Sequence, residues 1–245
     1  MGNLKLTIEY EGTNYHGWQF QPNRTTIQGI IQDKIFTITG ERVKLIGAGR
    51  TDAGVHAMGQ VANFRLKKDI PLPTLWRGLN SLLPPDVRIA DLQQVDDNFH
   101  SRYHAKSKEY KYQIFTGTVL SPFLYRYVYH LPLKLRLEDM FAAAELFVGK
   151  HDFTPFSPAV RGKKNAIREV FSSSFTQQKE MLIYRIRASG FLQYMVRNIV
   201  GSLIEVGKGK LSKENILELL SNPHCSGLAA PTAPPQGLFL IKIEY

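Results

Sequence analysis

The sequence has little that would suit secretion or a membrane. Its single cysteine, Cys225, rules out a disulfide within the chain and fits a reducing compartment. No apolar run reaches the roughly 18 residues of a membrane-spanning helix. The first residues, MGNLKLTIEY, indicate a strand and lack the charged-then-apolar layout of a secretion signal. We therefore expect a cytoplasmic protein that does not enter a membrane.

The usual signatures of nucleotide cofactors and of serine hydrolases are also missing. In the segment beginning at Gly47, Asp52 occupies the third glycine position of G-x-G-x-x-G, where a carboxylate would repel a pyrophosphate. GKGK at 207–210 fails as a phosphate-binding loop because no Ser or Thr follows Lys208. A G-x-S-x-G nucleophile elbow is absent. We expect no nucleotide cofactor.

A metal site is disfavoured for a different reason. His100 and His104 stand four residues apart and could share a helix face, but no third ligand is placed with them. Surface histidines satisfied by ordinary hydrogen bonds are the favoured interpretation.

What the sequence does have is positive charge. Lys and Arg number 31 against 21 Asp and Glu, a net charge of +10, which favours a polyanionic partner, with nucleic acid first. A basic protein without such a partner is the alternative. Basic and aromatic residues interleave in NFHSRYHAKSKEYKYQ at 98–113, as phosphate contacts combined with base stacking require, although a solvated strand over packed tyrosines would read the same. RGKKNAIR at 161–168 is a second basic segment.

Periodicity predicts a similar order of elements in each half of the chain. For the first half we expect strand 4–10, helix 26–38, strands 42–48 and 60–66, helix 73–82 and strand 87–95. For the second we expect strand 108–116, helix 137–149, a hairpin of 167–178 with 180–189, helices 191–206 and 212–220, and closing strand 238–245.

Each half thus approximates a β-α-β-β-α-β plan. The predicted fold class is α+β, with two ferredoxin-like halves, mainly antiparallel sheets and an active-site cleft between them. A polar link near 97–107 separates the halves, and we set the domains at 1–103 and 104–245.

One acid stands out within LIGAGRTDAGVHAMGQVANF, residues 45–64. Asp52 lies among glycines, two residues after Arg50 and four before His56. A tight turn would use Asp and Gly in this way. An acid that must stay ionised in a closed site would also keep a cation alongside. Arg197, inside the apolar run FLQYMVRNIVGSLIEVG, needs an anionic partner, and Asp52 is the obvious candidate.

Several blocks together resemble the bacterial tRNA pseudouridine synthase A (TruA) family: GRTDAGVHAMGQVANF, KEYKYQIF, HDFTPFSP, FLQYMVRNIVGSL and APPQGLFLIKIEY, in the family's order over nearly the whole chain. The resemblance implies isomerisation of uridine to pseudouridine at positions 38, 39 and 40 of the tRNA anticodon arm. It also implies a homodimer that uses no metal or cofactor. The basic loop 157–166 is the part that matches the family least well.

The resemblance also assigns roles to particular residues. Asp52 in RTDAG would be the catalytic carboxylate, and Tyr110 in KEYKY the aromatic that stacks on the target base. Arg197 in MVRNIVG would be the basic partner of Asp52, and Arg50 would fill the space left by the extruded base. Whether Asp52 attacks the sugar, attacks the base or removes a ribose proton is left open.

Two alternatives remain at this point. A noncatalytic RNA-binding protein of two ferredoxin-like halves would need the aromatic and basic residues but not Asp52, and the RNP1 signature of that class is missing. A related synthase acting on other RNA sites would share the motif, because target choice depends on loops that read RNA shape.

Overall fold

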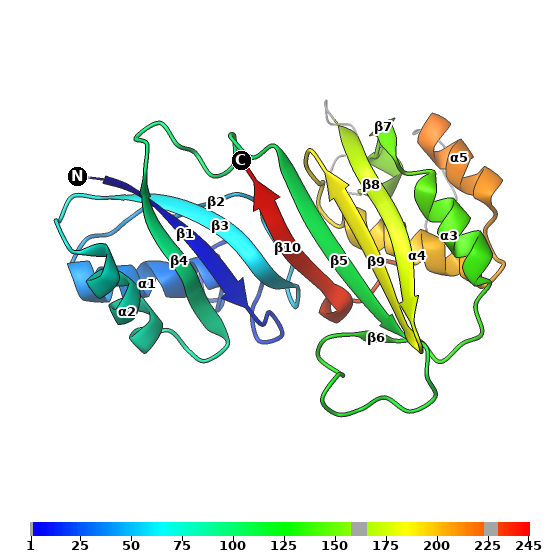
Figure 1. The fold of residues 1–245 in the computed structure, drawn as a ribbon, viewed down its shortest axis with the longest axis horizontal. Helices are drawn as coiled ribbons and strands as arrows, with labels where there is room; N and C mark the ends of the chain where they lie inside the picture. Colours follow the sequence, from blue (N-terminus) through cyan, green and yellow to red (C-terminus); the bar gives the residue numbers. More distant parts are fainter. Residues whose placement is uncertain (1, 158–165, 223–229) are drawn as a thin grey trace. The chain divides into compact units, whose positions relative to one another are not determined.

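The computed structural model describes residues 2–157, 166–222 and 230–245. By its contacts the chain divides into two compact units, one of Met1–Lys106 with Phe239–Tyr245 and the other of Ser107–Leu238. Figure 1 labels the helices and strands of both units.

The first unit carries its elements in the order strand, helix, strand, strand, helix, strand. They are β1 (Gly2–Tyr10), α1 (Ile27–Thr39), β2 (Ile46–Gly47), β3 (His56–Leu66), α2 (Leu72–Leu82) and β4 (Val87–Val95). β1 lies between β3 and β4 and pairs antiparallel with both, and β2 pairs antiparallel with β3. The closing strand β10 (Leu238–Glu244) adds to β3 in parallel. This is the β-α-β-β-α-β plan predicted for the first half.

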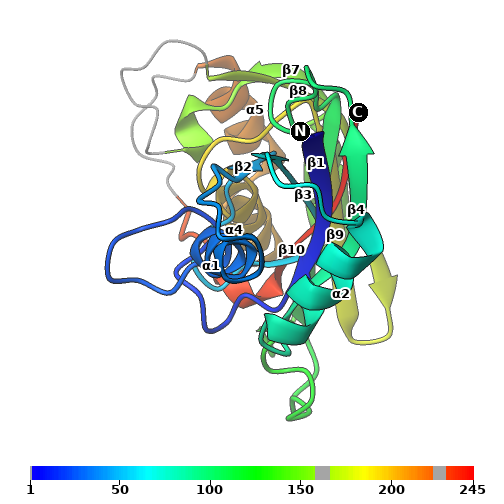
Figure 2. The same cartoon turned by 90° about the vertical axis from the view of Figure 1, so that its left-hand side faces the viewer.

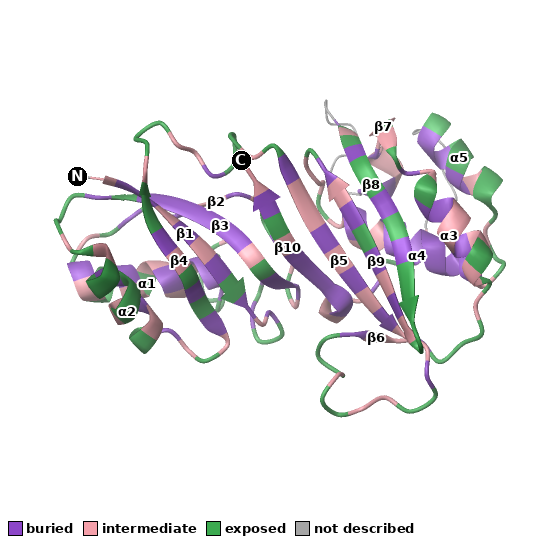
Figure 3. Ribbon diagram, in the orientation of Figure 1, coloured by how far each residue is buried: buried purple, intermediate pink, exposed green. Residues whose placement is uncertain are grey.

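Alternation along β1 places one face of the sheet in the core. Leu4, Leu6, Ile8 and Tyr10 are buried, whereas Glu9 is exposed, and Figure 3 shows the same alternation as colour. The helices α1 and α2 pack against each other, and α2 also packs against β4 (Figures 1 and 2). Thr26 caps α1 by accepting a hydrogen bond from the Gly29 N–H.

The predicted strand 42–48 is mostly not a strand. Only Ile46–Gly47 pairs, because side chains of α1 take the backbone groups that precede it. The Gln32 side chain donates to the Val43 carbonyl at 2.7 Å, and the Gln28 side chain donates to the Leu45 carbonyl at 2.8 Å. Alternating apolar residues cannot reveal that competition.

The second unit carries a sheet of neighbouring antiparallel strands with helices packed beside it. Its elements are β5 (Ser107–Phe115), β6 (Tyr129–His130), α3 (Leu137–Glu145), β7 (Gly149–Asp152), η1 (Thr154–Phe156), β8 (Ile167–Gln178), β9 (Met181–Ala188), α4 (Met195–Gly207), α5 (Lys213–Ser221) and η3 (Pro235–Gly237). The strand order is β5, β9, β8, β7, and β6 pairs in parallel with β5. α3 packs against α4, α5 and β8. The α+β class and the mainly antiparallel pairing are as predicted.

Two helix boundaries in this unit differ from the prediction. The helix expected over 137–149 ends at Glu145, because the next three N–H groups bond three residues back instead of four, and Gly149 begins β7. The helix expected from 191 begins at Met195, because Tyr194 before it has φ of 61° and cannot belong to a right-handed helix.

The domain ranges proposed from the sequence are 1–103 and 104–245. The division by contacts falls between Lys106 and Ser107, and the last residues cluster with the first unit through the pairing of β10 with β3. In the part of the chain that the structure describes, no helix is long and apolar enough to cross a membrane.

Candidate active site

Asp52 heads a tight turn. Its carbonyl accepts a hydrogen bond from the Val55 N–H at 3.2 Å, and Gly54 between them has φ of 77°, as the third position of a type II turn requires. The tight turn that the Asp and Gly residues of TDAG suggest is therefore present. Asp52 is only half-buried, whereas Thr51 and Val55 in the same turn region are buried, so a rigid frame carries a partly accessible acidic residue.

The segment 11–19 holds this turn in place. The Trp18 N–H donates to the Thr51 carbonyl at 3.1 Å, and the Gly54 N–H donates to the Tyr15 carbonyl at 3.3 Å. Gly17 has φ of 82°, and a Cβ there would lie 2.5 Å from the Thr51 carbonyl oxygen. Only glycine allows the two segments to approach this closely.

A buried hydroxyl pair adds to the frame. The Tyr10 hydroxyl lies 2.7 Å from the Thr51 hydroxyl, and burial raises the pKa of Tyr10 to about 12. Because the phenol keeps its proton at all ordinary pH values, this contact persists beside Asp52.

Arg50 lies two residues before Asp52 and is exposed. Its Nε donates to the Gln19 side-chain oxygen at 3.0 Å, and the Gln19 amide donates to Gln28 Oε1 at 2.8 Å. Gln28 also accepts from the Phe20 N–H at 2.7 Å, so α1 orients the segment that orients Arg50.

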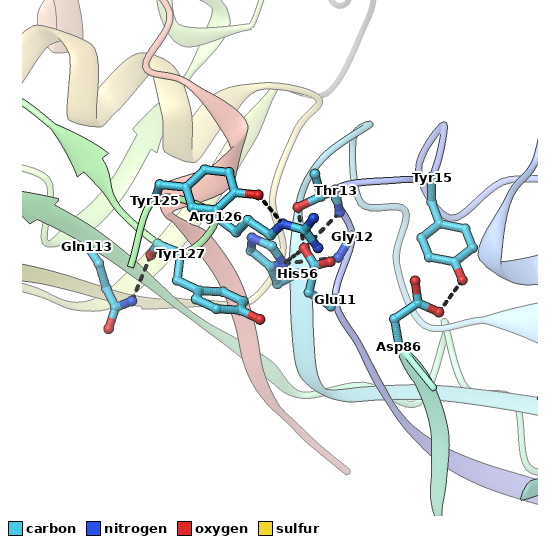
Figure 4. Close-up of polar contacts among 10 residues, drawn as sticks. All are labelled: Glu11, Gly12, Thr13, Tyr15, His56, Asp86, Gln113, Tyr125, Arg126 and Tyr127. Atoms are coloured by element: carbon cyan, nitrogen blue, oxygen red, sulfur yellow. Dashed lines mark hydrogen bonds and ion pairs between the residues drawn. The ribbon is translucent and has the colours of Figure 1, made fainter. Parts of the chain in front are cut away.

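His56, at the start of β3, is buried and ties the same segment to the sheet. Its Nδ1 accepts a hydrogen bond from the Gly12 N–H at 3.0 Å and lies 3.4 Å from a carboxylate oxygen of Glu11 (Figure 4). Its ring stacks on Phe239 with centroids 4.6 Å apart. The Tyr15 hydroxyl donates to Asp86 at 2.5 Å, a contact drawn in Figure 4. Burial first, and then this carboxylate, raise the pKa of Tyr15.

Tyr110 lies on β5 in the second unit. It is buried, as are Tyr112 and Ile114 at alternate positions of the same strand, and is 7% exposed. Its ring packs edge to face against the Phe191 ring, with the ring centroids 4.9 Å apart. Burial, and then Arg185 opposite it on β9, lower the pKa of the neighbouring Lys111.

Arg197 lies in the first turns of α4 and is half-buried. Its Nε donates to the Ala233 carbonyl at 2.7 Å, and its own carbonyl accepts from the Ala233 N–H at 3.1 Å. The guanidinium carbon is 5.3 Å from the Tyr194 ring. Asn198 binds the same segment by accepting from the Thr232 hydroxyl at 2.7 Å. These contacts fix the stem of Arg197.

His100 and His104 form hydrogen bonds within their own segment. His100 Nδ1 accepts from the N–H groups of Arg102 and Tyr103, at 3.2 and 3.3 Å. Across 2–157, 166–222 and 230–245, no group of three or more His, Cys, Asp or Glu residues could hold a metal ion. Cys225 and most of the basic loop 157–166 lie outside the described residues.

Sequence reasoning missed the segment 11–19 that supports the turn. Its run EGTNYHGWQ combines two glycines with two large aromatic residues and has neither helical nor strand periodicity. That composition marks a loop packed closely on other backbone, which is how the structure uses Gly17 and Trp18.

Comparison with known proteins finds one family whose members match both units of the chain. The family described as "tRNA pseudouridine synthase" matches residues 6–104 and 143–245. The tRNA pseudouridine synthase A of Thermoanaerobacter sp. (strain X514) is 44% identical over 245 residues, covering 100% of both chains. Those of Solibacter usitatus and Acetivibrio thermocellus are 45% and 44% identical, again over 100% of both chains.

Among solved structures, a chain of a Cbf5-Nop10-Gar1 complex aligns with a TM-score of 0.33 and 15% identity, over 82% of this chain and 54% of that one. This likeness is too weak to inform the assignment.

These full-length matches define an RNA-modifying isomerase: the chain belongs to the tRNA pseudouridine synthase family. Its activity is the isomerisation of uridine to pseudouridine in tRNA, and the resemblance seen in the sequence is confirmed.

Proposed function

We propose that the protein isomerises the uridines at positions 38, 39 and 40 of the tRNA anticodon arm, with Asp52 as the catalytic carboxylate. The observation that carries the proposal is the setting of Asp52. It is the half-exposed acid of a turn whose neighbours Thr51 and Val55 are buried and whose backbone is bonded to the segment 11–19. A catalytic group has to be held rigidly and yet be reachable by substrate.

The chemistry asks three things of the chain. The target base must leave its stack, which costs a few kcal/mol, and must then be held on an aromatic face. Cleavage of the N-glycosidic bond builds positive charge on the sugar, which a carboxylate stabilises or traps. After the base turns and rejoins the ribose through carbon, that carbon must lose a proton.

Tyr110, Arg50 and Arg197 have separate roles in the proposal. Tyr110 is the stacking face for the base, and its phenol moves the late proton. Arg50, whose stem is oriented through Gln19, occupies the space that the base vacates. Arg197 is the basic partner that keeps Asp52 ionised, and its Nε contact with Ala233 restricts its guanidinium.

The same proposal includes the compartment, the oligomeric state and the mode of tRNA binding. The enzyme acts in the cytoplasm as a homodimer and needs neither metal nor cofactor. Its net charge of +10 supports binding to the tRNA backbone, so affinity falls steeply as salt rises. Sedimentation at micromolar concentration tests the dimer, and a monomer there would remove that part.

The test of the proposal is a modification map. Unmodified tRNA transcripts are incubated with the protein in the presence of a chelator, treated with carbodiimide and read by primer extension. The expected result is stops that report pseudouridine at positions 38, 39 and 40 when uridine is present there in the transcript. Stops confined to other positions would replace the proposed target, and their absence in every tRNA would refute the proposed function.

A further inference from the structure

The segment His100–Lys106 carries an exposed aromatic residue that the roles given above do not use. Tyr103 is 75% exposed. One side of its ring stacks on His100, with centroids 4.2 Å apart and planes inclined by 30°. The Arg102 guanidinium carbon lies 5.9 Å from the ring centroid. These residues, with Lys106, form what we call the Tyr103 platform, and the segment 100–106 contains no acidic residue.

The backbone beneath the platform is anchored by buried polar groups. The Asn63 side chain accepts from the Ser101 N–H at 3.0 Å and donates to the Asn3 side chain at 3.0 Å. The Tyr245 hydroxyl donates to the Ser101 carbonyl at 2.8 Å. His100 Nδ1, by accepting from two successive N–H groups, closes the turn that carries Tyr103. Such a network fixes the turn while the Tyr103 side chain remains in solvent.

The same anchor reaches the strand that leads to Asp52. The Ser101 hydroxyl donates to the Ile46 carbonyl at 2.5 Å. Ile46 and Gly47 form β2, and the chain runs from there into the turn at Asp52. The platform therefore has a fixed position relative to Asp52 within the first unit.

We propose that the Tyr103 platform is a second RNA contact, on which an unstacked base of the tRNA stacks while Arg102 and Lys106 contact its phosphates. An exposed ring on an anchored turn, with an arginine beside it and a lysine in the same segment, fits a nucleobase and its backbone, because every base has a π-face and every nucleotide a negative charge. Packing within the protein does not account for a tyrosine left three-quarters exposed. The inference rests on the proposed function and adds a contact apart from the target uridine.

The experiment compares Tyr103→Ala and Tyr103→Phe with the unaltered protein. The matched control is Phe36→Ala, which removes another exposed ring of the first unit, one that lies 4.7 Å from an arginine, Arg42. Affinity for an unmodified tRNA transcript is measured by fluorescence anisotropy at several salt concentrations. Pseudouridine formation is measured in single turnover with saturating protein, and the oligomeric state by sedimentation.

For Tyr103→Ala we expect about a tenfold loss of affinity, within the range of base–aromatic stacking, with the saturated rate unchanged. Tyr103→Phe and Phe36→Ala should bind normally, and Arg102→Gln should lower the slope of log affinity against log salt by about one. Normal binding by Tyr103→Ala, an equal loss in Phe36→Ala, or a change in oligomeric state in Tyr103→Ala would overturn the platform. Failure of the unaltered protein to form pseudouridine would instead overturn the proposed function.

Discussion

Replacing Gly17 by alanine tests whether the segment 11–19 positions Asp52. Gly17 has φ of 82°, which costs an L-residue about 1–2 kcal/mol. The new Cβ would also lie 2.5 Å from the Thr51 carbonyl oxygen, where ordinary contact begins at 3.4 Å. Thr51 must therefore retreat by about 0.9 Å, the order of misplacement that costs an enzyme about 100-fold in rate. With the overpacking included, we expect a loss of about 3 kcal/mol in the free energy of unfolding.

Gly40→Ala separates the two effects. Gly40 has a similar φ of 76°, but a Cβ there would meet nothing within 4 Å. It should lose about 1–2 kcal/mol of stability and retain full activity. Urea unfolding gives the stability of each variant, and single-turnover pseudouridine formation under conditions where each is folded gives the rate. If Gly17→Ala keeps the normal rate while folded, the segment 11–19 does not position Asp52.

Three further predictions concern other parts of the site. Tyr110→Phe keeps the ring against Phe191 and loses the phenol, so tRNA affinity should hold while the single-turnover rate falls at least tenfold; an unchanged rate would exclude proton transfer by the phenol. Arg197→Lys keeps the charge but loses the planar fork and the Nε bond to Ala233, and we expect a rate loss of about tenfold or more together with a loss of about 1 kcal/mol in urea unfolding. Because burial raises the pKa of Tyr10 to about 12 against 10.0 unfolded, about 3 kcal/mol of stability from Tyr10 that is present below pH 10 should disappear as pH rises to 12. In urea unfolding, Tyr10→Phe should reduce the slope of stability against pH by that share, while the share of Tyr15, whose pKa burial also raises, remains.

Periodicity predicted β1 and α1 because each of these elements is buried mainly along one face. β1 alternates buried and accessible residues, and Ile27, Ile31 and Ile35 of α1 are fully buried at helical spacing. The same reasoning failed at 42–48, where the side chains of Gln28 and Gln32 bind the backbone. A contact between distant segments leaves no local pattern.

The family and its activity were within reach of the sequence, since GRTDAGVHA is a specific run. The supports of Asp52 were not. Gly17 contacts Thr51, which lies 34 positions further along the chain, and the Tyr10 hydroxyl pairs with the Thr51 hydroxyl over 41 positions. The type of each residue does not indicate which distant residue it contacts. The positive φ of Tyr194, before which α4 cannot begin, could not be predicted from the sequence either.

The measurement that bears most directly on the account compares Asp52→Asn with Asp33→Asn, a change of the same type at an exposed position on α1. Both variants are assayed for tRNA affinity and for pseudouridine formation in single turnover. We predict that Asp52→Asn binds tRNA with near-normal affinity and forms no product, while Asp33→Asn behaves as the unaltered protein. Turnover by Asp52→Asn at the normal rate would contradict the assignment of Asp52 as the catalytic carboxylate.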